Sequence, residues 1–223
     1  MSSAARRTLA RVFTMLAGIT SLVTTSATAQ AGCEPVAERK GRELGCFITA
    51  REELGPLPGD SALYWHIDAF TTEGQAQAAR AERSTVVRSL GRIWLFTIGR
   101  AGWRPSGGER IGLVGPLPLV GAEAYAAVYM EAEFQPGMQS PVHRHPGVEA
   151  WYTLQGEQCL ETPQGKLVQR AGDQGVMVPG GLPMILTGTG TGVRRSLVLI
   201  LQDAAQPRST PAVDWKPAGL CRA

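Results

Sequence analysis

Two histidines and a glutamate are the residues of this sequence best suited to carry out chemistry. His143 and His145 are separated by one residue, and Glu149 follows four residues later. Alternate side chains of an extended strand point to the same face, so the two imidazoles project together. Pro146 and Gly147 then turn the chain, which allows the Glu149 carboxylate to approach both rings from the next strand. Two imidazoles and a carboxylate on one wall predict a divalent-metal site with open coordination positions.

Histidine is scarce in this chain, which argues against a chance pairing. The sequence has three histidines, and two of them stand in this motif. With Gly137 before it and Gly156 after it, the segment reads Gly-x5-His-x-His-x3-Glu-x6-Gly. It resembles the first motif of the cupin superfamily at every named position. The resemblance implies a jelly-roll β-barrel with a metal in its mouth and a small-molecule ligand.

A second segment is similar to the second cupin motif, with two departures. It runs from Gly172-Asp173 to Pro179 and on to Met184. The family form has one residue fewer between its glycine and its proline, and it has a histidine, the fourth metal ligand, where Met184 stands. Three interpretations of Met184 follow. It fills space in an apolar pocket, it coordinates through its thioether and selects copper, or it marks a site that no longer binds tightly.

Further side chains are candidates for the same pocket. Trp151 and Thr153 alternate with Glu149 and so share its face, although core packing explains Trp151 equally well. His66 could complete the metal site or act as an acid or base, and a hydrogen-bonded structural histidine is the alternative. Arg144 points away from the site and is expected in a surface ion pair. Glu149 itself could be a metal ligand or a catalytic base.

The elements that must position these residues follow from residue 123 onward. Short strands separated by glycine-rich turns predict an all-β barrel. The expected strands lie at 125–134, 148–154, 158–162, 166–170, 175–178, 184–187 and 194–202. We therefore expect a mainly β protein whose single cupin (jelly-roll) barrel covers residues 123–203, with a C-terminal tail over 204–223 that runs along the surface.

The segment 32–122 predicts an α+β extension before the barrel. A strand at 63–70 is followed by a helix that residues 71–73 can cap and that runs to about residue 83. Strands at 85–87 and 93–98 complete a β-α-β-β unit. This unit is too short to form a second barrel, so we expect it to pack against the first.

Residues 1–31 predict a secretory signal peptide. A start with three arginines precedes a mostly apolar run at 12–23, and small residues follow to Ala31. The apolar run is too short to span a bilayer, and no other stretch is long enough. We expect a periplasmic or secreted protein, with the general and the twin-arginine export routes both open.

The mature chain has a balanced charge. Removing residues 1–31 takes away three arginines and no acidic residue, which leaves 19 basic and 19 acidic residues. This balance gives no electrostatic case for nucleic acid or an anionic membrane as a partner.

The four cysteines of the sequence favour disulfides in an exported protein and allow three pairings. Cys33 and Cys46 could close a local loop, and Cys221 could then tie the tail to Cys159. Metal ligation by these cysteines is the weaker alternative, because no Cys-x-x-Cys spacing is present.

The cupin resemblance implies a metal-dependent enzyme of oxygenase, isomerase or lyase type acting on a small organic molecule. The metal could be iron, manganese, zinc, nickel or copper, and the substrate stays open. A non-catalytic periplasmic protein that binds a metal or a small ligand is the second hypothesis, and a metal-free interaction barrel is the third. The resemblance also implies a homodimer formed through strands at the edge of the barrel.

Overall fold

The computed structural model describes residues 32–222. The predicted signal peptide, residues 1–31, lies outside the described residues. Within residues 32–222, no helix has the length and apolar character that crossing a membrane requires.

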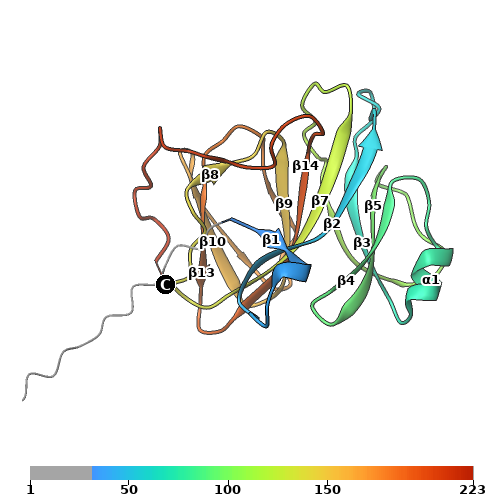
Figure 1. The fold of residues 1–223 in the computed structure, drawn as a ribbon, viewed down its shortest axis with the longest axis horizontal. Helices are drawn as coiled ribbons and strands as arrows, with labels where there is room; N and C mark the ends of the chain where they lie inside the picture. The colour runs from blue at the N-terminus through green and yellow to red at the C-terminus, as the bar shows by residue number, and fades with distance from the viewer. Residues whose placement is uncertain (1–31, 223) are drawn as a thin grey trace, which may run out of the picture.

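A six-stranded sheet runs through the middle of the molecule (Figure 1). In spatial order its strands are β1 (Glu34–Pro35), β2 (Gly45–Gly55), β7 (Tyr125–Phe134), β14 (Arg194–Asp203), β9 (Val148–Gln155) and β12 (Val176–Val178). All neighbours are antiparallel except β1 and β2, which are parallel. Because β1 and β2 precede residue 123, this sheet uses chain on both sides of that position.

Two smaller sheets face the six-stranded sheet and close a barrel. One contains β11 (Gly165–Arg170), β10 (Glu157–Thr162) and β13 (Ile185–Thr189), and the other contains β15 (Thr210–Pro211) and β8 (His143–Arg144). A single apolar cluster fills the space between them, including Val128, Trp151 and Val198. The protein is therefore mainly β, with a barrel of the expected jelly-roll kind.

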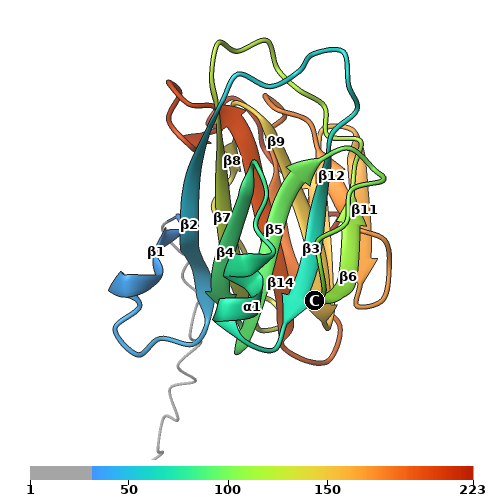
Figure 2. The ribbon, with the colours of Figure 1, turned by 90° about the vertical axis from the view of Figure 1, so that its right-hand side faces the viewer.

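A third layer covers the other face of the six-stranded sheet (Figures 1 and 2). It is a four-stranded sheet in the order β4 (Ser84–Ser89), β5 (Arg92–Gly99), β3 (Tyr64–Phe70) and β6 (Glu109–Val114), with α1 (Glu73–Ala78) between β3 and β4 in the chain. The Phe96 ring of β5 lies 4.9 Å from the Tyr129 ring of β7, centroid to centroid. The two sheets thus share an apolar interface.

The strand β7 shows why these layers form. All ten of its residues are buried, because both of its faces are covered. Ala127 and Tyr129 pack toward the four-stranded sheet, whereas Val128 and Met130 point into the barrel. The period of two in a strand therefore divides one apolar run between two cores.

The helix α1 starts as expected but ends earlier than the sequence predicts. Thr72 Oγ1 accepts a hydrogen bond from the Gln75 amide at 3.3 Å, and Gln75 Oε1 accepts one from the Thr72 amide at 3.2 Å, which completes a capping box. The helix ends at Ala78 rather than near residue 83. Ser84 Oγ accepts a hydrogen bond from the Ala81 amide, and Arg83 adopts φ +57°, so the chain has already turned into β4.

Two disulfides hold the ends of the described chain to the barrel. They join Cys33 to Cys46 and Cys159 to Cys221, as the local-loop pairing predicts. The C-terminal tail crosses the barrel mouth, where β15 pairs with β8 (Figure 1). The buried Glu161 carboxylate accepts hydrogen bonds from three consecutive tail amides, at residues 218–220. Three other residues of the tail, Arg208, Ser209 and Pro211, line the barrel interior, so the tail is part of the wall around the mouth.

Candidate metal centre

The three residues with metal-ligand spacing converge in the barrel mouth. His143 lies on β8, His145 lies in the turn that follows, and Glu149 lies on β9. One ligand atom from each lies within 4.8 Å of the others. His145 and Glu149 are 4% and 6% exposed, and His143 is partly buried. We call these three residues the metal triad.

Backbone carbonyls set the tautomer of both imidazoles. His143 Nδ1 lies 2.7 Å from the Pro141 carbonyl oxygen, and His145 Nδ1 lies 2.6 Å from the Arg208 carbonyl oxygen. A carbonyl can only accept, so each Nδ1 carries the proton and donates it. In a neutral ring the lone pair is then on Nε2, which is the arrangement of metal-binding histidines held by an outer hydrogen bond.

His145 and Glu149 face each other in a way that suits a shared cation. His145 Nε2 and Glu149 Oε2 are 3.0 Å apart, yet neither atom has a hydrogen-bond partner among the described residues. The distance is that of an ion pair, but the two groups are not aligned for a hydrogen bond. Buried polar atoms without partners are costly. A cation bound by both atoms would remove that cost, so the triad fits a metal ion.

The electrostatics of the triad point the same way. Burial alone would lower the pKa of His145, but the Glu149 carboxylate outweighs it and raises that pKa above its ordinary value. Burial alone would raise the pKa of Glu149, but His145 and His143 lower it overall. Burial lowers the pKa of His143, so that ring favours its neutral, ligating form. The triad thus combines a carboxylate with a place for positive charge beside it.

The turn between His145 and Glu149 is tightly packed, which fixes the triad. A Cβ atom on Gly147 would lie 2.0 Å from the Leu201 carbonyl oxygen. A Cβ atom on Gly180 would lie 2.7 Å from the Pro146 carbonyl oxygen. Only glycine allows such close backbone approach at these two positions. The segment 179–181, part of the second motif, therefore supports the turn of the first motif.

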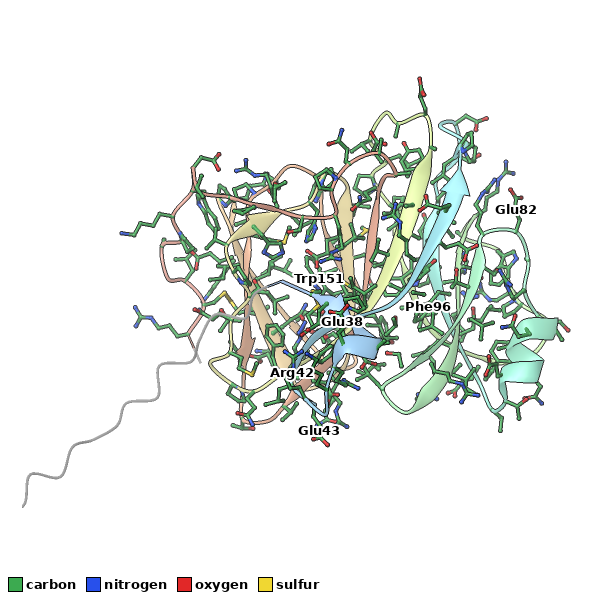
Figure 3. All side chains as sticks on the ribbon, viewed as in Figure 1. Glu38, Arg42, Glu43, Glu82, Phe96 and Trp151 are labelled. Carbon is green, nitrogen blue, oxygen red and sulfur yellow. A yellow bond between two sulfur atoms is a disulfide. The ribbon has the colours of Figure 1, made fainter. Side chains whose placement is uncertain are left out.

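The triad lines a cavity of about 360 Å³ inside the barrel. Its walls are largely apolar and include Trp151, Val198 and the Cys33–Cys46 disulfide. Figure 3 shows Trp151 on the barrel side of the six-stranded sheet, whereas Phe96 lies on the side of the four-stranded sheet. A cavity of this size suits a small organic molecule.

Met184 is placed beside the triad. It forms a β-bridge with His143, in which the two residues exchange backbone hydrogen bonds of 2.8 and 3.1 Å. Directly paired residues present their side chains to the same face, and Met184 lines the cavity. It is 1% exposed and belongs to the barrel core. Packing and thioether ligation are both compatible with this position.

The other candidate pocket residues have different locations. Trp151 lines the cavity, and Thr153 lies deeper on the same face, where its hydroxyl is hydrogen-bonded to Gln169 and Ser196 rather than lining the cavity. Of the two interpretations of His66, its location agrees with that of a hydrogen-bonded structural histidine, and it does not line this cavity. His66 lies on β3 in the four-stranded sheet, and its Nε2 is 2.9 Å from the Arg100 carbonyl oxygen. The six-stranded sheet separates it from the triad.

Arg144 forms an ion pair with Asp214 at 2.5 Å, which agrees with the surface pair expected for it. Two other arginines, which the sequence reasoning missed, line the cavity: Arg194 on β14 and Arg208 in the tail. The alternation of β14 contained a signal for Arg194, which has the same parity as Val198 and Ile200, both in the barrel core. No sequence pattern marked Arg208.

Known proteins resemble this chain in structure but not in sequence. No protein-family model matches the chain, and no curated protein matches it in sequence. A cupin superfamily protein from Desulfitobacterium hafniense is similar over 34% of this chain and 68% of its own, with 22% sequence identity and a TM-score of 0.32. The likeness therefore covers about a third of this chain.

Two enzymes are among the similar structures. A DMSP lyase structure matches 39% of this chain and 44% of its own, with 19% identity and a TM-score of 0.34. An oxalate oxidase structure matches 39% of this chain and 46% of its own, with 21% identity and a TM-score of 0.33. This chain spans less than half the length of either enzyme, so these likenesses do not extend to activity.

The motif and the barrel occupy the same part of the chain. The first motif is complete from Gly137 to Gly156, and β8 and β9 both lie within it. These strands belong to the sheets that enclose one apolar barrel core, and the side chains of the motif line its cavity. The barrel is thus similar in fold to solved proteins described as cupins, over about a third of this chain.

Proposed function

We propose that this protein is an exported cupin-domain protein that binds one divalent metal ion through His143, His145 and Glu149. We propose further that it uses the ion as an enzyme of oxygenase, isomerase or lyase type on a small organic molecule. One observation carries the proposal. Three ligand atoms meet within 4.8 Å, and backbone carbonyls hold the two histidines in the tautomer that leaves Nε2 free.

Each residue of the triad has a defined role in this proposal. His143 and His145 hold the ion through Nε2, and Glu149 holds it through a carboxylate oxygen. The carbonyls of Pro141 and Arg208 orient the two rings. When bound, the ion would supply a Lewis acid or a redox centre. The apolar walls restrict water, and Glu149 is the group that could take a proton from a ligand.

The choice among iron, manganese, zinc, nickel and copper stays open, because imidazole and carboxylate ligands suit several of them. Export is supported by two disulfides, which persist in oxidising compartments. A periplasmic or secreted location is part of the proposal. A homodimer is also proposed, and light scattering of the purified protein would test it.

Met184 favours a second candidate function, a periplasmic protein that binds a metal or small ligand without turnover. Its side chain is buried beside His143, so a thioether is available as a fourth ligand. Sulfur ligands favour copper, and four protein ligands would leave less room for a substrate. Copper bound without an exchangeable water would support this binder. An ion with open positions would support the enzyme.

Elemental analysis of the exported, mature protein, purified without added metal, tests the proposal. We expect about one equivalent of a transition metal in the wild type and almost none in His143→Ala, because removal of one of three protein ligands weakens binding strongly. His66→Gln is the matched control, since it removes the histidine outside the cavity, and it should keep the metal. Stoichiometric metal in a folded His143→Ala variant would refute the assignment.

A further inference from the structure

Arg194 is a buried cation that has no acidic partner within residues 32–222. It is 1% exposed and points into the barrel from β14. Its Nε donates to Gln158 Oε1 at 2.8 Å and to Ser196 Oγ at 3.1 Å, and its guanidinium lies 4.9 Å from the centre of the Phe134 ring. Among the described residues, Nη1 has no hydrogen-bond partner, and no carboxylate lies within ion-pair distance. A buried charge in this state is costly.

The charges around the cavity leave an excess of positive charge. Glu149 is the one acidic residue among its described lining residues, whereas Arg194 and Arg208 are both basic. Burial lowers the pKa of Arg194 to about 9, with Glu149 opposing the change, so the guanidinium stays charged at neutral pH. A divalent ion on the triad would engage the Glu149 carboxylate and add two positive charges. An anionic ligand would balance this positive charge.

The strand register places Arg194 at the opposite end of the cavity from the triad. Along β14 and β9, Ile200 pairs with Glu149, Val198 with Trp151, and Ser196 with Thr153. Arg194 comes next, and its bond to Ser196 shows that its side chain leans back toward the triad. Trp151 and Val198 form an apolar layer between the two ends.

We propose that Arg194 binds the carboxylate of the small-molecule ligand, whose apolar body lies beside Trp151 and Val198 and whose other end faces the triad. The inference rests on the proposed function for the role of the triad, but the carboxylate site itself depends on Arg194. A planar guanidinium matches a carboxylate well. A phosphate needs more donors, and Gln158 and Ser196 are already engaged by the Arg194 Nε.

Calorimetric titration of the full mature protein tests this proposal, with and without bound metal. The probes are acetate, phenylacetate and hydrocinnamate, each compared with its neutral amide. We expect phenylacetate or hydrocinnamate to bind, acetate to bind more weakly because it lacks an apolar body, and the amides to bind at least about tenfold more weakly than their acids. No binding by any carboxylate, or equal binding of acids and amides, would overturn the proposal.

The variant Arg194→Gln should weaken carboxylate binding at least about tenfold while the metal content stays unchanged. Arg195→Gln is the matched control. Arg195 is the next residue on β14, half exposed, and pairs with Glu133 at 2.6 Å, so its loss should leave binding within about twofold. Equal affinities in the two variants would refute the role of Arg194. If Arg194→Gln does not fold, the comparison of acids with amides in the wild type still decides.

The two proposals fail separately. A wild type that holds metal but binds none of the carboxylates would contradict the carboxylate site alone. A wild type that takes up no metal but prefers acids over amides through Arg194 would contradict the metal function alone.

Discussion

The two sides of the six-stranded sheet contain buried histidines in different surroundings. His66 lies on the outer face of the four-stranded sheet, because its neighbours Trp65 and Ile67 point toward the six-stranded sheet. On the four-stranded side, His66 contacts a backbone carbonyl and the edge of Trp103, and the nearby acidic residue Asp68 is engaged by Arg110 at 2.6 Å. In the barrel, His145 also contacts a carbonyl, but its second ring nitrogen faces the Glu149 carboxylate. A buried carboxylate that faces the second ring nitrogen is thus what distinguishes the candidate metal centre from the structural histidine.

The pKa values express this difference. Burial and the positive charge of Arg110 lower the pKa of His66 to about 4, so the ring stays neutral. The Glu149 carboxylate raises the pKa of His145 despite its burial. Positive charge is therefore excluded at one histidine and favoured at the other, although both are buried.

Removing one tryptophan from each side of the sheet should give the largest effects. Trp65→Ala and Trp151→Ala should each lower the free energy of unfolding by about 3–5 kcal/mol, because both indoles are almost fully buried. The variants should differ in ligand binding, since Trp151 lines the cavity and Trp65 packs against Phe96 and Tyr129. Denaturant unfolding and phenylacetate titration measure the two effects. A similar loss of ligand binding in both variants would contradict the separation of the faces.

Acid should destabilise the protein through His66. Its pKa is lower in the folded protein than the ordinary 6.5, so between pH 6.5 and about 4 the unfolded chain binds more protons. The free energy of unfolding should therefore fall as the pH falls through this window, by at most about 3 kcal/mol from this residue. His66→Gln should flatten that part of the curve, measured by denaturant unfolding of metal-free protein. An unchanged slope would show that His66 is not the source.

Replacing Met184 by histidine should raise the metal affinity of the triad. Met184→His would add an imidazole beside His143, so affinity for zinc, iron or manganese should rise by about tenfold or more. Met138→His adds a histidine outside the cavity lining and should leave affinity unchanged. Metal competition titrations measure both. Equal affinities in the wild type and Met184→His would mean that residue 184 does not face the ion.

Local patterns were sufficient to predict most of the barrel strands. The expected strands at 125–134 and 194–202 agree with β7 and β14 to within one residue. β2 and β6 were not among the expected strands. The run from Arg51 to Glu53 carries three charged residues in a partly exposed part of β2, so it lacks the apolar alternation that marks a strand. Pairing with β7 makes this segment a strand.

The sequence by itself determined the triad, because its three residues lie within seven positions and a strand and a turn bring them together. It also limited the four cysteines to three possible disulfide pairings. Only the tertiary structure decided that His66 lies outside the cavity, because its strand β3 belongs to the four-stranded sheet and not to the barrel. It also decided that Arg194, Arg208 and the Cys33–Cys46 disulfide share one cavity with the triad. These contacts join segments far apart in the chain, and only the burial of two apolar cores brings them together.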